Sequence, residues 1–178
     1  MTSRDPAGLH PMVRELFDRW LAAAIRAGLA PLAYCFQRSL DDQARLYRTN
    51  RSLAEIDRAH TLLLERGLVG EAEALFRVGH QPNVPDMLPT NAPPGLSWHN
   101  RKRYKGAAGA MAWDWVPAPS GRPQWKDARG YALGGELAED LGLTWSGRWR
   151  GKMRETAHIQ FDESGALDKW ALARGEYA

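Results

Sequence analysis

The second half of the chain carries two histidines and one aspartate whose types and surroundings could hold a metal ion. His99 lies in SWHN, and Asp114 lies between two tryptophans in AWDWV. His158 begins HIQFD, and Glu155 stands three residues before it. Two histidines and one carboxylate form the ligand set of an open catalytic zinc site, which keeps one position for water. A glutamate that does not bind the metal could take a proton from that water.

Each of these residues also has a purely structural interpretation. Asp114 could be an acid at a strand end that accepts a hydrogen bond from a backbone N–H group, and His158 could be a polar residue with satisfied hydrogen bonds. The chain has no HExxH motif, in which one helix fixes two ligands, and no CxxC pair. The residue types alone leave both interpretations open.

The other histidines and the single cysteine are expected to be structural. We expect His10, just before the first helix, to be exposed, and His60, on an apolar helical stripe, to lie at the core edge. His80 lies in a proline-rich loop where nothing indicates a site. The single cysteine, Cys35 in PLAYCF, excludes an internal disulfide and a cysteine-based zinc cage, and we expect it to be a small buried hydrophobe.

The elements that must position these residues follow from periodicity and capping signals. Helices are expected at residues 13–29, 39–47, 52–66, 71–78, 127–141 and 164–174. Strands are expected at PLAYCFQ, AWDWV and AHIQF. On such strands His158, Gln160 and Asp162 share one face, while the two tryptophans point away from Asp114. Helices followed by strands and loops predict the α+β class.

Residues 79–96 hold five prolines, so no regular structure is expected there. A loop of this length in a compact domain is usually functional or disordered. Eight tryptophans are many for 178 residues, and most of them lie in the second half. They could build either the wall of a cleft or a tryptophan-rich core.

Composition limits the class of partner. The net charge is +3 and the isoelectric point is near 9.2, which suits a polyanion such as nucleic acid, a cell wall or an anionic membrane surface. No nucleic-acid motif such as an RNP element or a zinc finger occurs, and no stretch reaches the length of a transmembrane span. The first residues lack the apolar segment of a secretory signal, so we expect a soluble protein that is made in the cytoplasm. We also expect it to be a monomer.

Four motifs occur in one order along the chain, namely TNAPPGLSWHN, MAWDWV, GLTWSGRW and ETAHIQF. Together they resemble the zinc D-alanyl-D-alanine carboxypeptidase and L-alanyl-D-glutamate endopeptidase family, often called the VanY-like or M15 peptidases, which includes many phage endolysins. The family signature Ser-x-His-x-x-Gly-x-Ala-x-Asp and its later acid-x-x-His element are matched at Ser97, His99, Ala112, Asp114, Glu155, His158 and Phe161. The family's Gly-Leu-x-Trp-Gly-Gly-x-Trp element is matched with Ser146 in place of one glycine. The resemblance spans residues of about 32–162.

The resemblance implies a role for each matched residue. It implies that His99, Asp114 and His158 bind Zn²⁺ and that Glu155 is the general base. It also implies a small antiparallel β-sheet that carries the zinc site and packs with helices. We expect a single domain over residues 1–178, with an N-terminal helix within 1–30 and a C-terminal helix within 163–178.

QRSLDDQ, residues 37–43, looks like the family's Arg-Ser element. By this resemblance Arg38 would help to hold the developing oxyanion, because a fixed guanidinium is a permanent charge in a partly dry cleft. The alternative interpretation is that Arg38 is a surface residue before the start of a helix. Gln43 and Ser97 are the candidate substrate-binding residues.

One departure from the family pattern lies between the first two ligands. The family separates its histidine and aspartate by six residues, whereas fourteen residues separate His99 from Asp114 here. The extra residues are roughly 101–109, and Ala110 occupies the family's glycine position. This segment could be a basic lip that contacts the substrate or a solvated loop, and we favour the loop.

The resemblance implies a zinc-dependent peptidoglycan peptidase that hydrolyses the stem peptide, with the L-alanyl-D-glutamate bond as the expected target. The alternatives are a D,D- or L,D-carboxypeptidase of the same family and, in a different class, a non-catalytic cell-wall-binding module. No group that would hold a free substrate carboxylate is identifiable. The expected partner is bacterial peptidoglycan, without nucleic acid and without stable membrane insertion, and the enzyme would reach the wall after release through the membrane.

Overall fold

The computed structural model describes residues 3–79 and 90–178 and confirms the α+β class. The helices are α1 (Pro11–Arg26), α2 (Leu40–Arg48), α3 (Leu53–Glu65), α4 (Val69–Arg77), α5 (Ala128–Glu139) and α6 (Lys169–Ala173). The strands are β1 (Pro31–Cys35), β2 (Lys102–Tyr104), β3 (Ala107–Gly109), β4 (Ala112–Pro117), β5 (Thr144–Trp145) and β6 (His158–Gln160). The expected loop at 79–96 lies in large part outside the described residues, as does His80.

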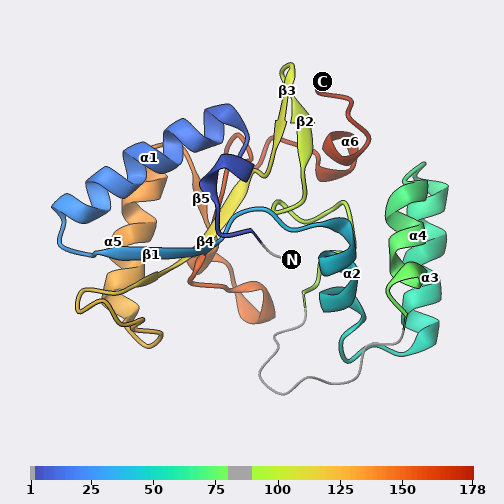
Figure 1. Ribbon diagram of the computed structural model, residues 1–178, viewed down its shortest axis with the longest axis horizontal. Coiled ribbons are helices and arrows are strands. Elements are labelled where there is room, and N and C mark those ends of the chain that lie inside the picture. Colours follow the sequence, from blue (N-terminus) through green and yellow to red (C-terminus); the bar gives the residue numbers. More distant parts are fainter. Residues whose placement is uncertain (1–2, 80–89) are drawn as a thin grey trace.

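Four strands form one antiparallel sheet in the order β1, β4, β6, β5, and β2 pairs with β3 in a separate hairpin (Figure 1). The central strand β4 pairs with β1 on one side and with β6 on the other. Its register with β6 places Trp113 opposite Ile159 and Asp114 opposite His158. Because successive side chains of a strand point to opposite faces, this register separates a tryptophan face from an acid-and-histidine face.

The tryptophan face of β4 builds the main core. Trp20 of α1 lies 5.4 Å from Trp113 and 5.0 Å from Trp115 between ring centroids, and all three side chains are fully buried. The indole Nε1 of Trp20 donates a hydrogen bond of 2.9 Å to the carbonyl oxygen of Gly134 in α5. These tryptophans therefore belong to a tryptophan-rich core, which α1 and α5 cover together (Figure 1).

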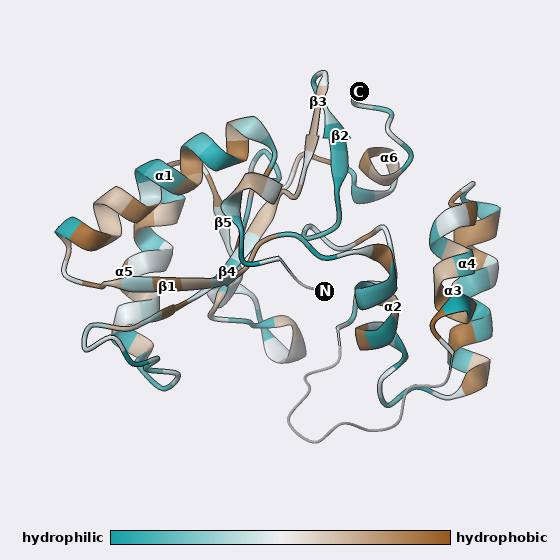
Figure 2. Ribbon diagram, in the orientation of Figure 1, coloured by the Kyte–Doolittle hydropathy of each residue, from teal (hydrophilic) through white to brown (hydrophobic). Residues whose placement is uncertain are grey.

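A second cluster of buried residues holds α2, α3 and α4 together, and it includes Ile56, Leu63 and Leu75. Figure 2 shows hydrophobic residues recurring between hydrophilic ones along these helices, the pattern of helices with one buried side. The Ser39 hydroxyl accepts a hydrogen bond from the backbone N–H of Asp42, and Ser52 forms a full capping box with Glu55. Both helix starts expected from these serines are confirmed.

Residues 101–109 do not form the solvated loop that we favoured. They form the hairpin of β2 and β3, in which Lys102 and Tyr104 are buried and Arg103 between them is exposed. The turn places Lys105 and Gly106 at φ values of 45° and 78°. The expectation that His10 is exposed is wrong. His10 is buried against the hairpin, and its Nε2 lies 2.9 Å from the carbonyl oxygen of Tyr104.

The C-terminal helix is shorter than expected. It begins at Lys169, where the Asp168 side chain accepts a hydrogen bond of 2.8 Å from the backbone N–H of Trp170. Glu163, Ser164 and Gly165 have φ values of 50°, 58° and 84°, which a right-handed helix cannot contain. Within the described residues, no helix combines the length and the apolar character needed to cross a bilayer.

We predict that Gly134→Ala destabilises the fold although alanine is the better helix former. A Cβ atom at Gly134 would lie 2.3 Å from the Trp115 ring, which is itself locked in the core. Overpacking of this kind costs roughly 1–3 kcal/mol, against a propensity gain of about 1 kcal/mol. Urea unfolding should therefore show a lower free energy of unfolding. The matched control is Gly70→Ala in α4, where a Cβ meets open space and the free energy should stay equal or rise. Equal effects of the two substitutions would contradict the packing argument.

Candidate metal centre

The polar face of the sheet brings the three expected ligands together. Asp114 and His158 are opposite each other on β4 and β6. His99 reaches them from the turn before the hairpin, and this turn is held by a hydrogen bond of 2.8 Å from the Arg38 N–H to the His99 carbonyl oxygen. A second hydrogen bond of 2.8 Å, from the Met111 N–H to the Trp98 carbonyl oxygen, ties the same turn to the start of β4.

The inward atoms of the three side chains form a compact triangle. His99 Nε2 lies 3.1 Å from Asp114 Oδ1 and 3.1 Å from His158 Nδ1, and His158 Nδ1 lies 3.0 Å from Asp114 Oδ1. The residues are 3%, 5% and 7% exposed for His99, Asp114 and His158. Donor atoms that share one metal at about 2.0–2.2 Å lie roughly 3 Å apart, so the triangle has the size of a ligand set.

The hydrogen bond at the outer nitrogen of His99 determines the state of its inner nitrogen. His99 Nδ1 lies 2.9 Å from the carbonyl oxygen of Phe36, and a carbonyl oxygen can only accept. The Nδ1 atom therefore carries the hydrogen. In the neutral ring, Nε2 then has a free lone pair that faces Asp114 and His158.

A longer relay has the same effect on His158. Its Nε2 lies 3.0 Å from Gln160 Oε1, and Gln160 Nε2 donates a hydrogen bond of 2.6 Å to Asp162 Oδ2. The hydroxyl of Thr144 and the N–H of Gly165 donate to the other oxygen of Asp162, at 2.6 and 3.0 Å. Because Asp162 accepts from the amide nitrogen, the amide oxygen of Gln160 must face His158 and accept its Nε2 hydrogen. This leaves His158 Nδ1 as a lone pair, the arrangement found behind metal-bound histidines.

Two imidazole lone pairs and a carboxylate oxygen thus converge in a buried space, where they repel one another unless a cation joins them. In the metal-free protein this cation is a proton. Burial lowers the pKa of His99, but the Asp114 carboxylate raises it by more, and the pKa rises to about 10. Burial also raises the pKa of Asp114, and the two histidines lower it by more, so that it falls below its usual range.

Cys35 lies beside this site, although the sequence indicates only a small buried hydrophobe. It is buried as expected, but its Sγ lies 3.5 Å from His99 Nδ1. Cys35, His99 and Asp114 form a buried group that could hold a metal ion. Both sets contain His99 and Asp114. We favour the set with His158, because the His99 nitrogen nearest to Cys35 donates its hydrogen to Phe36, whereas the other His99 nitrogen faces both Asp114 and His158. The pairing of β1 with β4 places Cys35 opposite Asp114, and no local pattern in the sequence predicts this pairing.

Arg38, Gln43 and Ser97 hold the surroundings of the centre. Arg38 donates to Gln43 Oε1 at 2.8 Å and lies 3.5 Å from Cys35 Sγ, so it faces the metal side of its segment. Gln43 is fully buried and its amide nitrogen donates to the Ala92 carbonyl oxygen at 2.6 Å. The Ser97 hydroxyl accepts from the His99 N–H at 3.3 Å and so shapes the turn. Direct contact of Gln43 or Ser97 with a substrate stays a prediction.

Glu155 is exposed and lies just before β6. Its backbone is held by Ser146, whose hydroxyl donates a hydrogen bond to the Glu155 carbonyl oxygen. The sequence also indicates no role for Tyr34 on β1. Burial raises the pKa of Tyr34, and the negative charge of Asp114 raises it further. Trp149 is half-buried, with its ring centroid 6.2 Å from that of His158. Trp149 therefore lies beside the centre.

We predict that the purified chain binds one transition-metal ion through His99, Asp114 and His158. Alanine at any of these positions should weaken binding by more than about 100-fold, and Gln160→Ala by about 10–100-fold, because Gln160 orients a ligand. Metal content after dialysis, measured by mass spectrometry, checks this. Cys35→Ser is the matched control and should keep the metal. Loss of the metal in Cys35→Ser together with retention in His158→Ala would assign the site to the cysteine set instead.

We predict that metal binding displaces a proton. The pKa of His99 in the folded protein lies at about 10, above its usual value of 6.5. The proton therefore stabilises the metal-free fold fully below about pH 6.5 and is lost as the pH rises toward 10. The free energy of unfolding of the chelator-treated protein should fall over this window, while metal affinity should rise. Urea unfolding and metal titration at stepped pH test both trends. His60→Ala, far from the centre, should leave the slopes unchanged, and a flat stability profile in the metal-free wild type would refute the assignment.

In comparisons with known proteins, no protein-family model matches the chain and no curated protein matches it. The family resemblance of the four motifs stays a prediction. What the chain can do must therefore be argued from the geometry of the centre.

Proposed function

We propose that the chain is a zinc-dependent peptidase that hydrolyses the stem peptide of bacterial peptidoglycan. One observation carries the proposal above all others. The two histidine lone pairs and the Asp114 oxygen converge within 3.0–3.1 Å, and hydrogen bonds behind both rings set their tautomers. This convergence gives three protein ligands and leaves further coordination positions for water and substrate.

Nitrogen and carboxylate ligands of this kind suit zinc, although iron(II) takes a similar set. When bound, zinc would lower the pKa of a water molecule to about 7 and polarise a peptide carbonyl group. Metal analysis decides between the two ions. Recovery of iron in place of zinc from the active chain would contradict the proposal.

The residues around the centre have the charges that peptide hydrolysis needs. Glu155 is an exposed carboxylate three residues before a ligand, where it can accept a proton and pass it to the leaving amine. Arg38 is held by Gln43 beside Cys35, and its permanent positive charge can stabilise a carbonyl oxygen that becomes negative. Trp149 beside His158 offers an apolar surface on which a peptide could lie.

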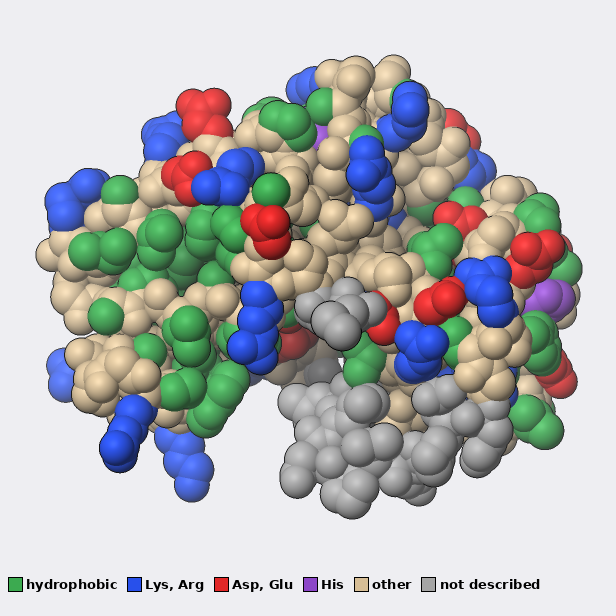
Figure 3. All heavy atoms as spheres, in the orientation of Figure 1, with side chains coloured by type: hydrophobic (Ala, Val, Ile, Leu, Met, Phe, Trp, Pro, Cys, Tyr) green, Lys and Arg blue, Asp and Glu red, His purple; other side chains and the backbone are tan. Residues whose placement is uncertain are grey.

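The substrate class rests on the motif resemblance and on charge. Within the stem peptide we favour the L-alanyl-D-glutamate bond, with a D,D- or L,D-carboxypeptidase as the alternative. The net charge of +3 suits the acidic groups of a cell wall. Figure 3 shows basic side chains dispersed among acidic ones on the face in view, without the continuous basic stripe that favours nucleic acid.

We predict that Glu155→Gln keeps the metal but reduces hydrolysis of purified sacculi by about 100-fold or more, because a general base contributes about 10²–10⁴-fold. The amide has nearly the same shape and cannot accept the proton. Dye release from labelled sacculi gives the rate, and metal analysis of the same sample confirms loading. Glu73→Gln on α4 is the matched control, since it removes an exposed carboxylate away from the centre.

A wild-type rate in Glu155→Gln would show that another group is the base. If wild-type protein loaded with zinc binds sacculi and releases nothing, the chain is a non-catalytic wall-binding module instead. Mass spectrometry of the released muropeptides identifies the bond. A new N-terminus on glutamate supports the endopeptidase, and loss of a terminal alanine supports the carboxypeptidase.

A further inference from the structure

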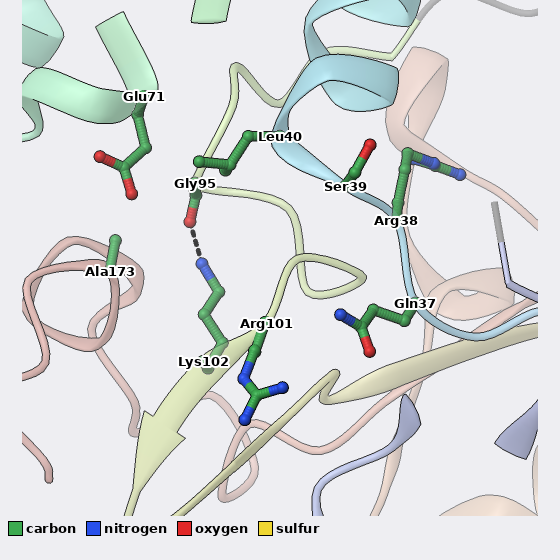
Figure 4. Close-up of a pocket in the computed structure, with 9 residues that line it drawn as sticks. All are labelled: Gln37, Arg38, Ser39, Leu40, Glu71, Gly95, Arg101, Lys102 and Ala173. Carbon is green, nitrogen blue, oxygen red and sulfur yellow. Dashed lines mark hydrogen bonds between the residues drawn. The ribbon is translucent and has the colours of Figure 1, made fainter. Parts of the chain in front are cut away.

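A cavity of about 270 Å³ lies between the start of α2, the start of α4 and the hairpin strand β2. Among the residues of the metal centre only Arg38 lines it. Figure 4 shows the Arg38 side chain turned away from Lys102, whose ammonium group points between Gly95, Glu71 and Leu40. The cavity is therefore a second feature, and Arg38 is the residue that it shares with the surroundings of the metal centre.

The Lys102 ammonium is the unusual group in this cavity. The residue is 3% exposed, and Nζ donates one hydrogen bond, to the carbonyl oxygen of Gly95. An ammonium group has three N–H donors. Among the described residues no carboxylate lies within ion-pair distance of Lys102 Nζ. Burial lowers the pKa of Lys102 to about 8, so the group is still mostly protonated near neutral pH. A buried cation without a paired anion is unfavourable.

The other charged groups of the cavity have opposite signs. Arg101 is exposed and adds positive charge, although Figure 4 shows its guanidinium directed away from Lys102 Nζ. Glu71 is half-buried, and its Cγ packs against Gly95. Its negative charge acts on Lys102 without reaching ion-pair distance. The cavity thus contains the buried Lys102 cation and a second cation, Arg101, at its edge. Its one carboxylate, Glu71, does not form an ion pair with Lys102.

We propose that this cavity binds a small oxyanion, a carboxylate or a phosphate group, which pairs with the Lys102 ammonium. The two remaining N–H donors of Lys102 supply charge-assisted hydrogen bonds. The cavity has room for a group of this size. The site does not depend on the proposed peptidase function, because none of the metal ligands lines the cavity.

The test is a titration of the full chain with inorganic phosphate and with acetate, followed through the backbone amide NMR signals of Gly95 and Lys102. Wild-type protein should show saturable shifts with and without added Zn²⁺. Lys102→Met should bind at least about tenfold more weakly, because it removes the charge-assisted donors. Arg101→Gln should bind about two- to fivefold more weakly, as expected for an exposed charge.

Two further variants give the experiment its controls. Arg103→Gln removes an equal charge from the same hairpin but outside the cavity, and it should bind like wild type. Glu71→Gln removes the opposing carboxylate and should bind about two- to fivefold more tightly. This gain cannot come from a structural defect. If Lys102→Met does not fold, the other three variants still decide the question.

The proposal is overturned if the shifts do not saturate, if they require added Zn²⁺, if Arg103→Gln weakens binding as much as Arg101→Gln, or if Glu71→Gln weakens binding. The last result would indicate a cationic ligand. Stem peptides with free and amidated carboxylates then distinguish the sources of the anion. Displacement of phosphate by the free form alone assigns the ligand to a peptide carboxylate, an arm that rests on the proposed function. Displacement by neither form assigns the site to a small free anion.

Discussion

The pairing of β4 with β6 is the constraint on which the candidate centre depends. One register decides that Asp114 lies opposite His158 and that Trp113 lies opposite Ile159. A shift by one residue would turn the tryptophans toward the polar face and Asp114 toward α1, so the core and the centre must form together or not at all. The packing of Trp113 and Trp115 against Trp20 therefore enforces the position of the Asp114 carboxylate on the opposite face of the strand.

The polar face has its own constraint, which is the direction of every hydrogen bond around the two rings. The Phe36 carbonyl oxygen accepts a hydrogen bond from the His99 ring, and the Gln160 amide oxygen accepts one from the His158 ring. The hydrogen bond from the Gln160 amide nitrogen to Asp162 prevents this amide from turning over. The inner nitrogen atoms of both rings are thereby directed toward Asp114 in the metal-free protein. A site organised in this way loses little freedom on binding, which is a general source of affinity.

Much of this arrangement can be inferred from the sequence, because it rests on local patterns. Alternation on AWDWV and HIQFD places Asp114 and His158 on polar faces, and Ser39 and Ser52 begin helices as capping residues should. Cys35 and Phe36 could not be assigned to the centre, because their contacts with His99 join residues 64 and 63 positions apart, respectively. The burial of His10 likewise depends on a contact 94 residues away.

The hairpin of β2 and β3 has a consequence for the chain between His99 and Asp114. Fourteen residues separate these two side chains, and a flexible loop of that length would have to be ordered each time the two come together. Here the intervening residues are already ordered by the strand pairing and by the burial of Tyr104. The entropy of closing the loop is lost during folding and not during metal capture. The spacing between the two candidate ligands can therefore lengthen without an added entropic cost at the centre, provided that the added residues fold by themselves.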